Sequence, residues 1–127
     1  MKIYLAARYS RLNELKYYCT ELENIGYTVT SRWIKGNHQI NDPNDIITQA
    51  RFAKEDYEDI LASDLLISFT EPPRKLNNSR GGRHVEYGIA LALKKKIIII
   101  GYRENVFHYL NEHYKSWKEA FEHISKL

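Results

Sequence analysis

Two short apolar segments constrain the fold more than any other feature of this 127-residue sequence. DLLISF at 64–69 and KIIII at 96–100 each predict a β-strand. The second of these is apolar at every position after its lysine, which is typical of a strand buried on both faces. Such strands occur mainly in parallel sheets that helices cover on both sides, so the chain is expected to contain a sheet of this kind.

Strands and helices are predicted to alternate along the rest of the chain. Further strands are expected at 2–6, at 27–31 and near 112–115, and apolar residues recur at helical spacing over 12–25, 45–62, 83–95 and 116–126. The expected apolar face of the helix at 45–62 consists of Ile46, Ile47, Ala50, Ala53, Tyr57, Ile60 and Leu61. This alternation predicts an α/β fold, a flavodoxin-like or Rossmann-like three-layer sandwich with a parallel sheet of four to five strands. One domain is expected over residues 1–127.

Composition excludes several classes of protein. A content of 43% hydrophobic and 28% charged residues is ordinary for a globular domain, and a net charge of +3 is too small to indicate a nucleic-acid polymer as partner. Cys19 is the single cysteine, so no internal disulfide is possible, and the five histidines lack the spacing of a metal site. From the N-terminal residues we expect neither a signal peptide nor a membrane span, and we expect no membrane partner and a cytoplasmic protein.

Loops after the strands are the expected ligand site, because ligands of such folds bind beyond the carboxyl ends of the strands. The candidate loops are 7–11, 32–44, 70–82 and 101–109. Arginine, which grips phosphate and carboxylate groups with two hydrogen bonds, is concentrated in or beside them and suggests a small anionic ligand. Neither a P-loop nor a GxGxxG motif is present, which disfavours nucleoside triphosphates and dinucleotides. The loop arginines are Arg8, Arg11, Arg32, Arg74, Arg80, Arg83 and Arg103.

Two loop segments could hold different parts of a ligand. In the first loop Arg8, Ser10 and Arg11, with the amides of the next helix, could hold an anion, or Ser10 could simply cap that helix. After the second strand, Trp33 and His38 could form a stacking wall for a nucleobase, although most aromatic side chains pack in cores. The aromatic residues that could join this wall are Tyr4, Tyr9, Phe69 and Tyr87.

Two acidic residues are candidates for chemistry. Glu86 begins an apolar helix, where it could cap the helix or stand ionised at the ligand crevice. The glycines at 81, 82 and 88 favour the second interpretation, because they permit close approach of a ligand. Asp56 lies near the apolar stripe of its helix and could face inward, whereas Glu55, Glu58 and Asp59 are expected to form a solvated acidic face.

Four segments together resemble the nucleoside 2-deoxyribosyltransferase superfamily, which includes 2'-deoxynucleoside 5'-phosphate N-hydrolases and CMP-type N-glycosidases. They are KIYLAARYSR, TSRWIKGNH, AKEDYEDILASDLLISF and GGRHVEYGIALALKKKIIIIGYRENVFHYL. The most specific parts are a D-x7-D pattern at Asp56 and Asp64 and a G-x-x-x-E-x-G pattern at Gly82, Glu86 and Gly88. The resemblance implies a flavodoxin-like fold, cleavage of a C1'–N glycosidic bond, and no metal or organic cofactor.

The resemblance also implies roles for individual residues. Glu86 would be the nucleophile that forms a covalent glycosyl ester, and Asp56 the acid that assists departure of the base. Tyr4 and Tyr9 would line the sugar and base pocket. Asn105 lies in a segment that family members present to a neighbouring subunit, which implies a homodimer or a higher homo-oligomer.

Departures from the family pattern leave the reaction open. Ser79, Arg80 and Arg83 stand where phosphate-specific members tend to have serine, so these residues could bind a 5'-phosphate with a different spacing. The expected activity is cleavage or transfer at the N-glycosidic bond of a (deoxy)nucleoside or its 5'-monophosphate. The alternatives are a 2'-deoxynucleoside 5'-monophosphate N-hydrolase, a nucleotide-sensing module without turnover, and cleavage of a dinucleotide such as NAD.

Overall fold

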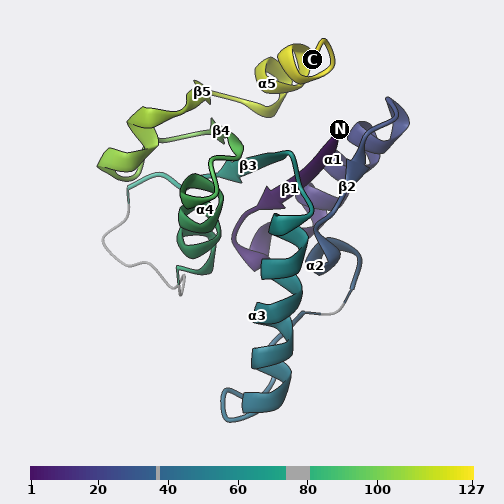
Figure 1. Ribbon diagram of the computed structural model, residues 1–127, viewed down its shortest axis with the longest axis vertical. Helices are drawn as coiled ribbons and strands as arrows, with labels where there is room; N and C mark the ends of the chain where they lie inside the picture. Colours follow the sequence, from purple (N-terminus) through teal and green to yellow (C-terminus); the bar gives the residue numbers. More distant parts are fainter. Residues whose placement is uncertain (37, 74–80) are drawn as a thin grey trace.

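A single parallel sheet organises the molecule (Figure 1), for which a computed structural model describes residues 1–36, 38–73 and 81–127. Its order, β2-β1-β3-β4-β5, is that of flavodoxin-like folds and confirms the predicted fold class. Every residue of β3 is buried, as are all but the first of β1 and β4, so the centre of the sheet is covered on both faces. The strands are β1 (Lys2–Ala6), β2 (Thr28–Val29), β3 (Leu65–Phe69), β4 (Lys96–Ile100) and β5 (Glu112–Tyr114).

Helices cover the sheet in two layers. On one face α3 packs against α4, and on the other α1 and α5 meet where the ring of Tyr18 stacks on Trp117 at 4.4 Å. Right-handed crossovers place α1 and α3 on opposite faces because β2 and β3 lie on opposite sides of β1. None of the described helices is both long and apolar enough to cross a membrane. The helices are α1 (Leu12–Asn24), α2 (Arg32–Lys35), α3 (Ile46–Leu61), α4 (Gly82–Ala92) and α5 (Trp117–Ile124), with the 3-10 helices η1 (Tyr9–Arg11) and η2 (Val106–Leu110).

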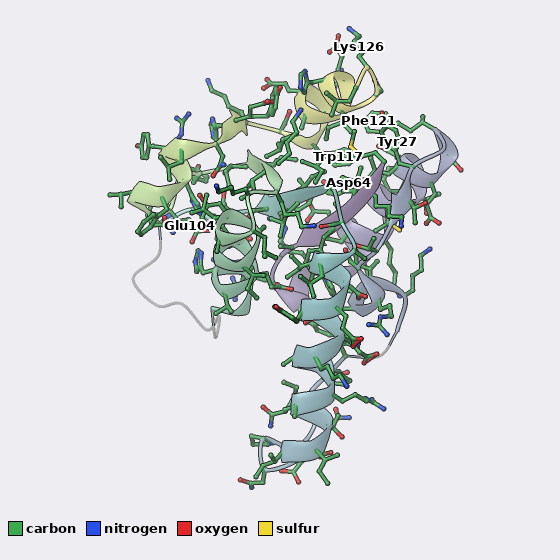
Figure 2. All side chains as sticks on the ribbon, in the orientation of Figure 1. Tyr27, Asp64, Glu104, Trp117, Phe121 and Lys126 are labelled. Carbon is green, nitrogen blue, oxygen red and sulfur yellow. The ribbon has the colours of Figure 1, made fainter. Side chains whose placement is uncertain are left out.

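The C-terminal helix is tied down by polar contacts as well as by packing. Figure 2 shows Trp117 and Phe121 of α5 close to Tyr27, at the end of the molecule opposite Glu104. The Tyr27 hydroxyl donates to the carbonyl of Ile124 at 2.9 Å, and Trp117 Nε1 donates to Glu21 at 2.7 Å. These bonds fix α5 against α1 and the start of β2.

Short helices occupy two segments that were expected to be loops. In the segment 32–44, α2 turns Trp33 and Ile34 into the core, and Trp33 Nε1 donates to the carbonyl of Leu5 at 2.8 Å. In the segment 101–109, η2 begins at Val106 after Asn105, whose side chain accepts from the amide of Phe107. The buried side chains of Trp33 and Ile34 and the cap by Asn105 therefore stabilise short helices where the sequence pattern predicted loops.

The apolar face predicted for α3 is mostly exposed. Of the seven residues assigned to it, Ile60 alone is buried, while Ile46 and Ile47 are 77% and 85% exposed. The residues that α3 buries are Phe52, Asp59 and Ile60. The N-terminal part of α3 extends beyond the sheet (Figure 1), so its apolar residues have no strand to pack on.

Gly101 is required where β4 ends. Its φ of 109° is disfavoured for other residues, and a Cβ there would lie 2.7 Å from Thr70 Oγ1. We expect Gly101→Ala to lower the free energy of unfolding by about 1–3 kcal/mol, measured by chemical denaturation.

Gly88→Ala is the matched control for that experiment. Gly88 lies within α4, and a Cβ there meets no atom within 4 Å. This substitution should raise the stability by about 0.5–1 kcal/mol, since alanine is the better helix former. A loss of stability in both variants would contradict the assignment of strain to Gly101.

Candidate active site

A cavity of about 440 Å³ opens at the carboxyl ends of β1 and β3. This is the point where the strand order reverses, the usual place of ligand sites in open α/β sheets. Its walls come from the loop after β1, from α2 and the segment after it, from α3 and from the start of α4. The lining residues are Ala7, Arg8, Tyr9, Ser10, Trp33, His38, Ile40, Phe52, Asp56, Gly82, Arg83 and Glu86.

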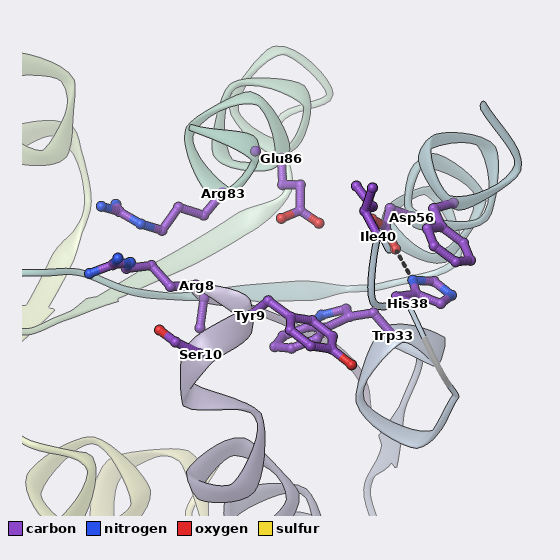
Figure 3. A pocket seen from close by; sticks show the side chains of 12 residues that line it. Arg8, Tyr9, Ser10, Trp33, His38, Ile40, Asp56, Arg83 and Glu86 are labelled. Atoms are coloured by element: carbon purple, nitrogen blue, oxygen red, sulfur yellow. Dashed lines mark ion pairs between the residues drawn. The ribbon is translucent and has the colours of Figure 1, made fainter. Parts of the chain in front are cut away.

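Glu86 points into this cavity from α4 (Figure 3). The helix begins after Gly81, which has a φ of 80°, and Glu86 is the fifth residue of the helix rather than part of its cap. Its carboxylate accepts a hydrogen bond from the hydroxyl of Tyr4, a fully buried residue of β1. The capping interpretation is therefore wrong, and β1 orients the carboxylate instead.

Burial governs the protonation of Glu86. It raises the pKa of this carboxyl from 4.5 to about 8, helped by the charge of Asp56 and opposed by the hydrogen bond from Tyr4. Glu86 makes no ion pair with a cation among the described residues. The group therefore exchanges its proton near neutral pH.

Asp56 faces the same cavity from α3 and confirms that this position turns inward. Its Oδ1 is buried, lies 3.7 Å from His38 Nδ1 and accepts no hydrogen bond within the described part of the chain (Figure 3). Burial, with the charges of Asp59 and Glu55, raises the pKa of Asp56 to about 7. Burial also lowers the pKa of His38, so a neutral imidazole stands beside this acid.

Aromatic rings form one wall of the cavity. His38 stacks on Phe52 with ring centroids 4.2 Å apart and planes 15° from parallel. The ring centroids of Tyr9 and Trp33 lie 6.3 Å apart. Trp33 is held from behind by its bond to the carbonyl of Leu5. This wall offers flat surfaces to a planar ring such as a nucleobase.

The arginines beside the cavity are paired with carboxylates. Both terminal nitrogens of Arg83 donate to Glu104, at 2.5 and 3.0 Å, and the Arg83 side chain is 1% exposed. The Glu71 carboxylate forms an ion pair with Arg11 at a nitrogen–oxygen distance of 3.0 Å and a longer one with Arg8 at 3.7 Å. Glu104 also accepts from the amide of Glu71, so one network joins these charges. Their positive charge is largely neutralised, which weakens the sequence argument for an anionic ligand at these positions.

Arg32 lies outside the cavity lining and is bound by Asp59. Asp59 accepts from Nε and from the backbone amide of Arg32, at 2.8 and 2.9 Å, and is 7% exposed. The expectation that Asp59 belongs to a solvated acidic face is therefore wrong. The pair clamps α2 to α3 and so helps to hold the wall that carries Trp33.

The structure brings together most, though not all, of the residues predicted for the site. Tyr4 is buried behind Glu86 instead of lining the cavity, and Arg11 and Asn105 also lie outside the lining. Residues missing from the prediction are Ala7, Ile40 and Phe52 in the lining and Glu71 and Glu104 as partners of arginine. Glu71 and Glu104 follow β3 and β4 in the sequence, and this position could have indicated that they lie near the loop arginines. Ser79 and Arg80 lie outside the described residues, as does Arg74.

No cluster of three or more His, Cys, Asp or Glu side chains in residues 1–36, 38–73 and 81–127 is arranged to hold a metal ion. Fold and cavity together define a flavodoxin-like α/β protein with two carboxyl groups of raised pKa facing one aromatic-walled cavity. Asp56 and Glu86 are the two acidic residues of the lining.

Comparison with solved structures finds the same fold in two enzymes and in a conserved protein. A 2-deoxyribosyltransferase from the psychrotolerant bacterium Bacillus psychrosaccharolyticus superposes with a TM-score of 0.74 at 20% identity, over 94% of this chain and 90% of that one. The CMP N-glycosidase BcmB of Clostridium botulinum gives a TM-score of 0.62 at 24% identity, over the whole of both chains. A conserved protein from Enterococcus faecalis gives 0.67 at 20% identity, over 99% and 97%. No family model and no curated protein matches the sequence.

Replacing Glu86 by glutamine should change the pH dependence of stability. Between pH 4.5 and about 8 the folded wild type keeps a proton on Glu86 that the unfolded chain has released, so its stability falls as pH rises through this window. Glu86→Gln has no titrating group at this position. The stability of the variant minus that of the wild type should therefore be about 5 kcal/mol larger at pH 9 than at pH 4.

Urea denaturation at a series of pH values measures this difference. Glu122→Gln, a substitution of an exposed glutamate on α5, serves as the control and should follow the wild type. Parallel stability curves for wild type and Glu86→Gln would show that the carboxyl is not buried as described.

Proposed function

We propose that the protein acts on the N-glycosidic bond of a (deoxy)nucleoside or its 5'-monophosphate, as a member of the nucleoside 2-deoxyribosyltransferase superfamily formed by a single domain over residues 1–127. The observation that carries this proposal is the pair of carboxyl groups, Glu86 and Asp56, facing one cavity with an aromatic wall. The sequence motifs around these residues and the names of two structural neighbours support it.

In the first step Glu86 acts as the nucleophile. One carboxylate oxygen attacks C1' of the sugar, a C–O bond forms, and the C1'–N bond breaks with its electron pair moving to the base. Asp56 in its protonated form supplies the proton that the departing base takes up. Tyr4 donates to the Glu86 carboxylate and holds it in position. The product is a glycosyl ester on Glu86 and a free base.

In the second step an acceptor attacks C1' and releases Glu86. Water gives a free sugar, whereas a second base gives a new nucleoside, and in both cases Asp56 takes back a proton from the acceptor. Two displacements at one carbon retain the anomeric configuration. The flat rings of Tyr9, Trp33 and His38 are suited to hold either the leaving base or an acceptor base.

Whether the substrate carries a 5'-phosphate depends on cations that are free to bind it. Arg8, Arg11 and Arg83 are engaged by Glu71 and Glu104, so a phosphate would have to compete with these carboxylates. This favours an unphosphorylated nucleoside over the phosphorylated substrate that the loop arginines suggested. Assays with both substrate types decide the point.

Base release is the direct test of the proposed activity. The protein is incubated with each deoxynucleoside and its monophosphate, with and without a free acceptor base, and the products are separated by chromatography. CMP is included because one structural neighbour is a CMP N-glycosidase. Glu86→Gln should lower the rate by at least about a thousandfold and Asp56→Asn by about a hundredfold or more, while Glu122→Gln leaves it unchanged. Full activity of Glu86→Gln would refute the proposal.

A nucleotide-sensing module without turnover makes a different prediction. In that case no substrate releases its base, and calorimetric titration finds equally tight nucleoside binding by wild type and Glu86→Gln. An enzyme of the proposed kind instead leaves a covalent sugar on the wild-type chain after rapid quenching, visible as an increase in intact mass that Glu86→Gln lacks. Release of nicotinamide from NAD would identify the dinucleotide alternative.

The pH dependence of kcat/KM should be bell-shaped with its maximum between about pH 7 and 8. The active form needs Glu86 ionised and Asp56 protonated, and the pair shares one proton between the pKa values of about 7 and about 8. In Asp56→Asn the basic limb should disappear, because the acid that must keep its proton no longer titrates, while the acidic limb set by Glu86 remains. A flat profile from pH 6 to 9 would contradict these roles.

A further inference from the structure

A second cavity, of about 510 Å³, lies at the carboxyl ends of β4 and β5. It shares no lining residue with the candidate active site, and its volume is in the range of small-molecule sites. It stands on the same edge of the sheet as the first cavity, where open α/β folds bind ligands. Its lining residues are Gly101, Tyr102, Arg103, Tyr109, His113 and Lys115.

Positive charge in this second cavity is not neutralised. Arg103 is the one arginine of the described residues that makes no ion pair, and Lys115 makes none either within those residues. The neighbouring acid, Glu104, turns away to bind Arg83. No aspartate or glutamate belongs to the lining. The cavity thus differs from the first one, where each arginine of the lining has a carboxylate partner.

Aromatic rings complete the second cavity. The Arg103 guanidinium lies over the ring of Tyr109, 4.8 Å from its centroid, and Tyr102 and Tyr109 are 56% and 69% exposed. His113 Nε2 lies 2.5 Å from the carbonyl of Gly101, which ties β5 to the end of β4 at the base of the cavity. Exposed tyrosines beside an unpaired cation suit a ligand with both a flat ring and a negative charge.

We propose that this second cavity binds a phosphate monoester that carries an aromatic or heteroaromatic ring. The phosphate lies between Arg103 and Lys115, and the ring rests on Tyr102 or Tyr109. Two unpaired cations match the charge of about −2 that a phosphate monoester has above its second pKa, near 6. Arginine also binds phosphate oxygens with two parallel hydrogen bonds. Nothing in this site requires the glycosidic activity of the first cavity.

Titration with phenyl phosphate tests this site without the glycosidic reaction, because the probe has no glycosidic bond. Backbone amide shifts of the isotope-labelled full chain are followed by NMR. We expect saturable shifts at 101–103, 109 and 113–115. Arg103→Gln and Lys115→Gln should each weaken binding by about tenfold or more. Lys118→Gln, the same change of charge at an exposed lysine of α5, should leave the affinity unchanged.

Further probes separate the two parts of the ligand. Inorganic phosphate should bind more weakly than phenyl phosphate, and phenol should cause no saturable shift at these residues. Equal affinity for phosphate and phenyl phosphate would overturn the role of the tyrosines, and equal affinity for phenol would overturn that of the cations. Shifts confined to residues around Glu86, or undiminished binding by Arg103→Gln, would overturn the site itself. Since both cations are exposed, unfolding curves of the variants should match the wild type.

Discussion

Burial of the central strands on both faces is the constraint on which the rest of this molecule depends. Because β1, β3 and β4 are covered by helices on both sides, polar groups have little place along the strands and gather at their ends. The carboxyl edge of the sheet therefore collects both signs of charge. How these charges pair with one another determines which groups remain available for a ligand.

At the first cavity the pairing is unequal in a chemically useful way. Glu71 and Glu104 form ion pairs with the arginines. Glu86 instead accepts a hydrogen bond from the neutral hydroxyl of Tyr4, and Asp56 lies beside the neutral imidazole of His38. Burial raises the pKa values of both groups toward neutrality, because no cation acts on Glu86 and the charge of Arg32 offsets burial at Asp56 only in part. Two carboxyl groups that exchange protons near pH 7 can each take two roles. In the proposed reaction Glu86 is the nucleophile of the first step and the leaving group of the second, and Asp56 is the acid of the first step and the base of the second.

Much of this arrangement could be predicted from the sequence, because the apolar runs of β3 and β4 fixed the type of sheet and the sheet fixed which loops meet. Glu86 and Asp56 both line the first cavity because strand order brings the start of α4 and the middle of α3 to one edge. Side-chain pairing could not be predicted in the same way. Asp59 was misassigned since helical periodicity does not show that Arg32, 27 residues away, donates to it twice. Tyr4 was expected in the pocket, but its strand position buries it behind Glu86.

The same limit explains the error in α3. The spacing of its apolar residues showed that they share one side of the helix, but it did not show that this side is mostly exposed. Periodicity states which residues share a side of a helix, whereas the length of the sheet decides how much of that side is covered. A related distinction separates the two cavities at the carboxyl edge. The arginines in or beside the loops looked alike in the sequence. In the structure Arg83 of α4 is paired with Glu104, whereas Arg103, which precedes Glu104 in the chain, lies over the exposed ring of Tyr109. Glu104, the residue that follows Arg103, therefore affects both sites: by turning toward Arg83 it neutralises that arginine of the first cavity and leaves Arg103 of the second one without a carboxylate partner.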